Sequence, residues 1–329
     1  GEVLDIYTDP GYADRVAPAS FRDYLDWVAH RDHDVAAAAW SDYLADLAGP
    51  SIVWPGGGDL IGSRVDTADL HLDLDPAVAR DVHEIAREVG VTVSTVLQAS
   101  WAMTLGRLLG TSDVVIGNNV SGRPPELVDA DRIIGLLFNT LPFRVRSSPF
   151  ESVATMLRRV QAEQLDVMEH SYVALSDIQE RAGSGALFDT LFVVQNFGYE
   201  DSGPGEDTEI DVQSGSSTDA THYPLTFAVS PSAEDGNHAV HVRLSYRRDA
   251  FGDDEAQRVL GRYVSILTDM VSDTARPVSR ISASLPGEEA LVCVSGENRV
   301  VVDETVNDLL RRQVSRTPQA TALVSGHRE

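Results

Sequence analysis

Two stretches of the sequence place carboxamide side chains at the ends of predicted buried strands, where they could bind a polar ligand. Asn139 lies between two apolar pairs, and Gln195 and Asn196 end an apolar run that begins at Leu187. An amide carries both donors and acceptors, so at a strand end it can hold the polar backbone of a substrate. The same side chains could instead satisfy hydrogen bonds inside the core, and the residue pattern leaves both interpretations open.

Asp189 is the one acidic residue within the apolar run 187–194. A carboxylate in apolar surroundings must be hydrogen-bonded or paired with a charge. We therefore favour a structural role for Asp189, in a turn or at a cap, over a catalytic one.

The histidines do not predict a metal site. Two His-x-x-His spacings occur, His30/His33 and His238/His241, and neither has an apparent third ligand of the kind that zinc sites need. His238 and His241 would also point to opposite faces of a strand. Common signatures for nucleotide binding and hydrolysis, such as the phosphate loop and the nucleophile elbow, do not occur in the sequence.

Composition narrows the classes of partner. The chain has 329 residues, with 26 basic against 51 acidic side chains and a net charge of −25. Nucleic acid and anionic membranes attract positive patches, so this acidity argues against both. Cys293 is the only cysteine, and no run approaches the roughly 18 to 20 apolar residues of a membrane span. Without a recognisable signal peptide, we expect a cytoplasmic chain whose natural start lies before Gly1.

Helix and strand patterns are mixed along most of the chain. Asp75 and Pro76 predict the start of a helix that Gly90 ends, and Thr92 predicts the cap of a largely apolar helix over 93–109. Further helices are expected over about 150–169 and 254–271, strands over 113–117, 138–145, 190–195, 224–229 and 240–246, and loops at 49–62 and 198–220. The mixture indicates an α/β (α+β) fold.

Six stretches occur in an informative order. The most specific are Ser121-Gly-Arg-Pro and, shortly after it, Ile134-Gly-Leu-Leu-Phe-Asn-Thr. The other four are Phe21-Arg-Asp-Tyr-Leu-Asp-Trp, Leu187-Phe-Asp-Thr, Tyr223-Pro-Leu-Thr and Leu244-Ser-Tyr-Arg-Arg-Asp. Together, over residues 1–285, they resemble the condensation domain of nonribosomal peptide synthetases.

The resemblance implies a chloramphenicol-acetyltransferase-like fold of two lobes, the first of them incomplete here. It implies that an upstream donor and a downstream acceptor carrier protein deliver phosphopantetheine arms into a tunnel, where the acceptor amine attacks the donor thioester and forms an amide. Because both substrates are tethered, no directly bound cofactor is expected. The implied site residues are Asn139, Asn196 and Gln195 near the tunnel, Ser121, Gly122 and Arg123 in a latch over the cleft, and Arg144 and Asp189 in structural roles.

The same resemblance divides the chain into three parts. Residues 1–66 would be the end of the first lobe and a crossing segment, and residues 67–285 the second lobe. Residues 286–329 would be a linker and the start of an adenylation domain, which the stretch Thr305–Leu323 resembles.

One departure from the family bears on mechanism. The family's His-His-x-x-x-Asp-Gly motif, whose second His lies at the reaction centre, is absent from these residues. We expect the motif upstream of Gly1, so this chain by itself should be inactive. Because part of the first lobe is absent, we also expect an exposed apolar surface where that lobe would pair, and therefore self-association. One alternative is a non-catalytic module that recruits carrier proteins, and replaced histidines in the upstream motif would indicate it. Another is an acyltransferase that uses coenzyme A, but the adenylation-like tail argues against it.

Overall fold

The structure, a computed structural model, describes residues 19–56, 66–124, 126–183, 185–195, 222–234, 237–285, 287–288 and 305–321. The loop expected at 198–220, residues 57–62 of the loop expected at 49–62, and Asn196 lie outside these residues. The chain divides into two compact units, Gly1–Leu285 and Pro286–Glu329, and each is described by itself.

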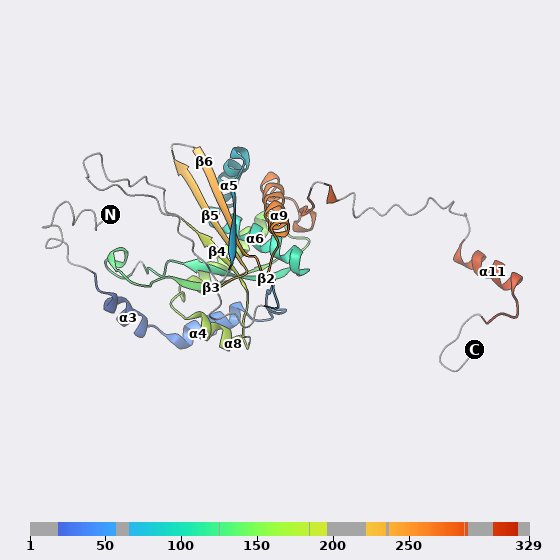
Figure 1. The fold of residues 1–329 in the computed structure, drawn as a ribbon. Helices are drawn as coiled ribbons and strands as arrows, with labels where there is room; N and C mark the ends of the chain where they lie inside the picture. Colours follow the sequence, from blue (N-terminus) through green and yellow to red (C-terminus); the bar gives the residue numbers. More distant parts are fainter. Residues whose placement is uncertain are drawn as a thin grey trace. The chain divides into compact units, whose positions relative to one another are not determined.

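A six-stranded sheet runs through the first unit in the order β1-β6-β5-β4-β2-β3 (Figure 1). Its strands are β1 (Thr67–Asp73), β2 (Asp113–Val120), β3 (Asn139–Arg146), β4 (Thr190–Val194), β5 (Leu225–Glu234) and β6 (Asn237–Arg247). Strands β2, β4 and β5 are parallel to one another. The pairs β1–β6, β5–β6 and β2–β3 are antiparallel.

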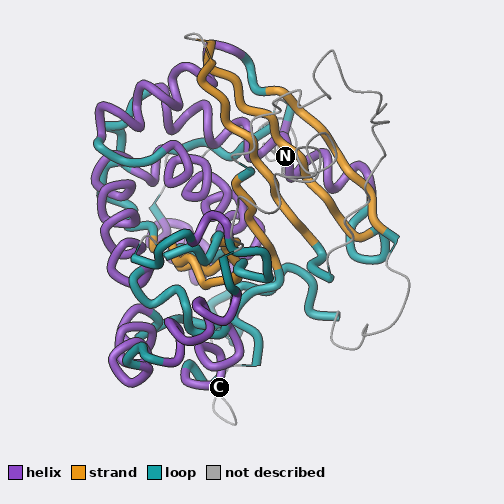
Figure 2. The backbone as a smooth tube through the Cα atoms, turned by 90° about the vertical axis from the view of Figure 1, so that its left-hand side faces the viewer, coloured by secondary structure: helices purple, strands orange, loops and turns teal. Residues whose placement is uncertain are grey.

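Apolar residues of α5 (Pro76–Val89), α6 (Val93–Leu109) and α9 (Asp253–Ser272) pack against one face of this sheet, together with the first half of α7 (Val153–Met168). Figure 2 shows long helices packed along one side of the strands. The Asp75 carboxylate accepts the backbone N–H of Ala77 at the start of α5, and Gly90 ends the helix in the left-handed region with φ of 77°. Every residue of α6 from Thr95 to Gly106 is buried, as the apolar residues on all sides of this helix predict.

The opposite face of the outer strands is polar. In β6, the alternate residues Val240, Val242 and Leu244 lie in the core, whereas His241 and Arg243 between them are half-exposed. Successive strand residues point to opposite faces, so one face of β1 and β6 is left to polar side chains.

A second apolar cluster ties the N-terminal helices to the sheet. Helix α4 (His33–Tyr43) packs with α8 (Leu175–Arg181) and the end of α7 (Val153–Met168) against β2 and β3. Trp40 is buried at the centre of this cluster, and its Nε1 donates to the carbonyl oxygen of His170 at 3.1 Å. Helix α3 (Phe21–Ala29) precedes α4 and has no buried residue. These contacts place α4 in one packed body with α7 and α8, while the lobe boundary at residue 66 stays a prediction.

The predicted helices over 76–89 and 93–109 are confirmed. The helix expected from about 150 begins at Val153, because the Ser152 hydroxyl caps it by accepting the N–H of Thr155. Neither the strand β1 nor the helix α8 was predicted. The hairpin strands reach Glu234 and Asn237, so they are longer than the expected 224–229 and 240–246.

The second unit contains the helix α11 (Val306–Arg316). A capping box starts it: the Thr305 hydroxyl accepts the N–H of Asp308, and the Asp308 carboxylate accepts the N–H of Thr305. Its apolar residues Val306, Leu309, Leu310 and Val314 are exposed. Within the described part of the chain, no helix combines the length and apolar character needed to cross a bilayer.

Candidate functional site

The carboxyl ends of the parallel strands form the edge where the predicted site residues gather. Strand β2 ends at Val120 and continues into the latch segment, residues 121–124, while Asn139 opens β3 directly opposite Val120. Gln195 directly follows β4. The neighbouring strand β5 extends beyond the end of β4, and its residue Ser230 lies beside Gln195. Because β2 lies between β3 and β4, Asn139 and Gln195 flank its end from both sides. Ligands of open α/β sheets commonly bind at this edge.

Gln195 is held by the sheet through both its backbone and its side-chain oxygen. Its backbone N–H donates to the carbonyl oxygen of Val229 at 2.8 Å, and its Oε1 accepts the Ser230 hydroxyl at 3.3 Å. The side chain is half-buried. Asn196, predicted to act beside it, lies outside the described residues.

Asn139 is held more tightly. Its amide nitrogen donates to two carbonyl oxygens, those of Ser171 and Val173, each at 2.8 Å. Both amide protons are therefore committed to the turn after α7. Trp40 donates to His170 in the same turn. The described geometry makes Asn139 a group that positions residues 170–173.

That turn forms one wall of a pocket of about 690 Å³ beside the latch segment. The other walls come from α3, the start of α4, the end of β2 and the end of α7. Alongside polar and charged groups, the lining contains aromatic and apolar side chains. They include Tyr24, Trp27, Val35, Val120, Leu165, Met168 and Tyr172.

Charged groups border the same pocket. The Arg31 guanidinium lies over the Trp27 ring, 3.8 Å from its centroid, and its Nη2 is 3.8 Å from the Glu126 carboxylate. This pair links the α3–α4 turn to the segment that follows the latch. The His170 ring also lines the pocket, and its buried Nδ1 has no hydrogen-bond partner among the described residues.

The latch segment packs against the connecting segment, residues 126–138, that leads to β3. Gly122 has φ of 58°, and a Cβ built on it would lie 1.7 Å from the carbonyl oxygen of Leu137. Only glycine fits so close an approach in the left-handed region. Arg123 donates from Nη1 to the carbonyl oxygens of Ala130 and Ile133. Ser121 lines the pocket with these two residues.

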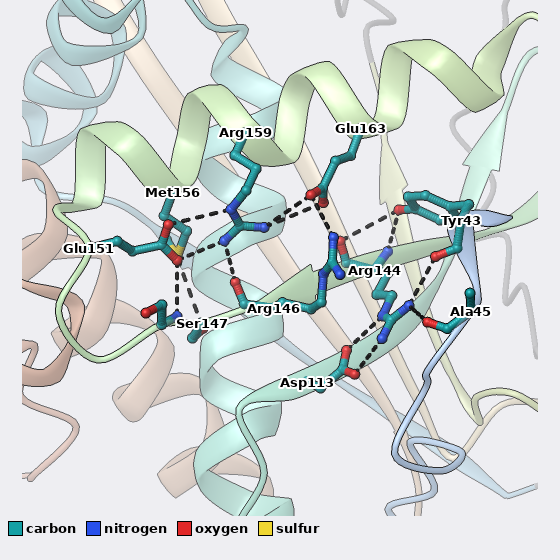
Figure 3. Close-up of polar contacts among 11 residues, drawn as sticks. Tyr43, Ala45, Asp113, Arg144, Arg146, Ser147, Glu151, Met156, Arg159 and Glu163 are labelled. Atoms are coloured by element: carbon teal, nitrogen blue, oxygen red, sulfur yellow. Dashed lines mark hydrogen bonds and ion pairs between the residues drawn. The ribbon is translucent and has the colours of Figure 1, made fainter.

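Arg144 lies in a polar cluster in which all three of its guanidinium nitrogens form hydrogen bonds (Figure 3). Its Nε and Nη2 donate to the two carboxylate oxygens of Asp113 at 2.8 and 2.7 Å, and its Nη1 donates to the carbonyl oxygens of Tyr43 and Ala45. The hydrogen bond with Asp113 raises the pKa of Arg144. Burial raises the pKa of Tyr43, whose hydroxyl accepts the backbone N–H of Arg144 at 2.7 Å. Arg144 therefore joins the end of α4 to the β2–β3 hairpin.

A second charged network continues along α7 (Figure 3). Arg159 bonds to Glu151 at 2.7 Å and to Glu163 at 3.4 Å, and Arg146 bonds to Glu163 at 2.7 Å. All four charges are paired, so the network fastens α7 to β3.

Asp189 lies at the opposite end of β4 from Gln195. Its two carboxylate oxygens accept the backbone N–H groups of Val53 at 2.9 Å and Trp54 at 2.8 Å. Burial raises the pKa of Asp189, against the lowering effect of these hydrogen bonds. The position and partners of Asp189 fit the structural role that its apolar surroundings predict.

The described edge is suited to binding and positioning. The Asn139 amide and the Arg123 guanidinium hold backbone carbonyls, and the pocket lining combines aromatic, apolar and charged side chains. Sequence reasoning did not find Arg31, Glu126 or Tyr172, because nothing in their local spacing separates them from solvated residues. Trp27 could have been found, since it ends the aromatic segment 21–27 that resembles a family motif.

A mixed sheet with helices packed on one face and polar groups at its carboxyl edge is the architecture of a chloramphenicol-acetyltransferase-like lobe. The X-domain from teicoplanin biosynthesis has this fold, with a TM-score of 0.65 at 22% identity over 78% of this chain and 59% of that chain. The first condensation domain of the calcium-dependent antibiotic synthetase gives a TM-score of 0.60 at 18% identity, over 79% of this chain and 55% of that chain.

Residues 4–292 match the family model of the condensation domain, and the chain belongs to that family. It is 30% identical to a linear gramicidin synthase protein of Brevibacillus parabrevis over 314 residues, covering 92% of this chain and 4% of that protein. It is 31% identical to vanchrobactin synthetase VabF of Vibrio anguillarum over 304 residues, covering 92% of this chain and 10% of that protein. The chain thus spans a small part of these relatives. Condensation domains of such synthetases are acyltransferases that form peptide bonds.

Proposed function

We propose that this chain works within a nonribosomal peptide synthetase and forms an amide between two carrier-bound substrates. The acceptor's α-amine attacks the carbonyl carbon of the donor thioester, so a C–N bond forms, the C–S bond breaks, the amine loses a proton and the donor's carrier thiol is released. The observation that supports this most directly is the condensation family match over residues 4–292.

The partners in this proposal are an upstream donor carrier protein and a downstream acceptor carrier protein. Each would present its substrate on a phosphopantetheine arm, and no further cofactor is bound. Holding two tethered reactants in place removes much of the entropic barrier to their reaction. The proposal includes the cytoplasmic location expected from the sequence.

Within the proposed site, Gln195 and Asn196 act as positioning groups at the carboxyl edge of the sheet, and Asn139 acts through the turn 170–173. The proposal keeps Ser121, Gly122 and Arg123 as the latch. Arg144 and Asp189 hold the framework, in agreement with their bonds to backbone groups of α4 and of residues 53–54.

Residues 286–329 belong, in this proposal, to a linker and the start of an adenylation domain in the same protein. Two features support it. The stretch Thr305–Leu323 resembles the opening of such a domain, and Pro286–Glu329 forms a unit separate from Gly1–Leu285.

A second candidate is a condensation-like module that recruits carrier proteins without forming bonds. The family's His-His-x-x-x-Asp-Gly motif decides between the two candidates, because intact histidines favour bond formation and replaced histidines favour recruitment; these 329 residues do not include the motif.

The test is turnover by the synthetase that contains these residues, with donor and acceptor loaded on their carrier domains and the amide detected by mass spectrometry of the intact carriers. We expect amide formation, lowered about tenfold to a hundredfold by Gln195→Ala, because a misplaced reactant has costs of that order. The control is Gln257→Ala, on the exposed side of α9. Carrier binding without any amide product would replace this proposal with the recruiting module.

A further inference from the structure

Two histidines that are 170 residues apart in the sequence meet on the polar face of the sheet. His71 is in β1 and His241 is in β6, and the register pairs Asp73 with His241 and His71 with Arg243. The two histidines are therefore diagonal neighbours on adjacent strands. Nδ1 of His71 lies 3.3 Å from Nε2 of His241.

Asp73 determines which nitrogen of His241 is available. Its Oδ1 is 2.8 Å from Nδ1 of His241. An ionised carboxylate can only accept, so Nδ1 of His241 carries a proton, and in the neutral ring the lone pair of Nε2 then points toward His71. Metal-binding histidines usually have such a carboxylate on the second ring nitrogen, where it fixes the tautomer and the orientation of the ring.

The separation of the two nitrogens matches that of two ligands on one ion. Zn²⁺ binds histidine nitrogens at about 2.0–2.1 Å in tetrahedral sites, which places two ligand nitrogens about 3.3–3.4 Å apart. In the neutral form with its proton on Nε2, His71 presents the Nδ1 lone pair to the same point. The observed 3.3 Å therefore requires little movement of either ring.

The surroundings are accessible and slightly acidic. His71 is exposed, and the His241 side chain is 43% exposed. Asp69 and Asp73 lie on the same face with Arg243, and Ser245 donates to Asp69. With two carboxylates and one guanidinium, this face carries a net negative charge around the two histidines, which favours the binding of a cation.

We propose that His71 and His241 bind a divalent transition-metal ion such as Zn²⁺ through Nδ1 and Nε2, with Asp73 orienting His241. Among the described residues no third His, Cys, Asp or Glu completes a protein ligand set. Water, or a donor atom of a bound partner, takes the remaining positions. The ion fastens the edge strand β1 to β6. His238 does not take part, because residues 238 and 241 point to opposite faces of β6, as their spacing predicts.

The test uses the full 329-residue chain and Zn²⁺ alone, measured by calorimetric titration and by the unfolding midpoint with and without metal. We expect one saturable site and a metal-dependent rise in the midpoint. His71→Asn and His241→Asn abolish both, and Asp73→Asn weakens affinity about tenfold to a hundredfold. Binding weakens in acid, because protons compete with the metal ion for the ligand nitrogens.

The matched control is His83→Asn. His83 also neighbours a histidine, His238, with ring centroids 4.3 Å apart, but the rings are stacked. Stacked rings do not direct their lone pairs to a common point, so this variant binds Zn²⁺ as the parent does. The metal-free midpoints of all variants show whether each one folds. Absence of saturable binding, or equal binding by folded His71→Asn and the parent, would overturn the proposal.

Discussion

Arg144 and Asp113 form a two-pronged ion pair across the β2–β3 hairpin, with nitrogen–oxygen distances of 2.8 and 2.7 Å. The Arg144 side chain is 3% exposed and that of Asp113 is 16% exposed. The remaining guanidinium nitrogen donates to the carbonyl oxygens of Tyr43, the last residue of α4, and of Ala45, two residues further on. One side chain thus ties the sheet that carries the candidate site to the helix beneath it.

Replacing Arg144 with Ala is therefore expected to lower the free energy of unfolding by about 3 kcal/mol or more, because it leaves a largely buried carboxylate unpaired. Urea unfolding measures this. Adding Asp113→Asn should recover part of the loss. Arg80→Ala, which removes the exposed ion pair with Glu84, serves as control and should cost under about 1 kcal/mol. Equal losses for Arg144 and Arg80 would show that the pair is not structural.

Gly122 tests the close approach of the latch segment to Leu137. Gly122→Ala should destabilise the protein by more than the about 1–2 kcal/mol that the left-handed region alone costs, since its Cβ would overlap the Leu137 carbonyl oxygen. Gly183→Ala is the matched control, because Gly183 has φ of 67° and no atom within 4 Å of a built Cβ. Urea unfolding of both variants decides, and an equal cost would contradict the contact.

Asn139 tests the link between the sheet edge and the pocket wall. Asn139→Asp replaces two donors by an acceptor facing the carbonyls of Ser171 and Val173, at an expected cost of about 2 kcal/mol or more. Hydrogen exchange at residues 170–173 should accelerate. Asn119→Asp, in the neighbouring strand, should leave exchange at that turn unchanged. Slow exchange in Asn139→Asp would show that Asn139 does not hold the turn.

Asp189 gives a pH dependence with a defined sign. Burial raises its pKa in the folded state, so the folded protein binds the proton more tightly than the unfolded chain does. The stabilisation from this proton is fully present below the unfolded pKa of about 3.9 and is lost as the pH rises through the folded pKa. The free energy of unfolding of the parent minus that of Asp189→Asn should therefore fall between acidic and neutral pH. A rise over that interval would indicate that the hydrogen bonds from Val53 and Trp54 outweigh burial.

The connecting segment before β3 exposes a stripe of apolar side chains. Ile134, Leu136 and Phe138 are 81%, 81% and 57% exposed, whereas Leu137 between them is buried. Large exposed apolar patches promote association, so light scattering of the chain should give a mass above that of the monomer. The triple variant Ile134→Ser, Leu136→Ser, Phe138→Ser should lower that mass. A monodisperse monomer of the parent chain would contradict this expectation.

Local signals in the sequence determined much of the helical framework. The caps at Asp75 and Thr92 and the stop at Gly90 act within a few residues, so the helices over 76–89 and 93–109 were predictable. The motif stretches likewise indicated the family before any contact was known. Strand β1 was not predictable, because its short alternating pattern becomes a strand through pairing with β6, far along the chain.

Tertiary structure alone decided the roles of individual polar residues. The sequence left Asn139 open between core and cleft, and its two carbonyl partners come from a turn more than 30 residues away. It could not show that Asp189 binds the backbone of residues 53–54, or that His241 meets His71 and not His238. Each of these contacts joins distant segments, and hydrogen-bond partners of that kind are chosen by how the sheet and helices pack rather than by local spacing.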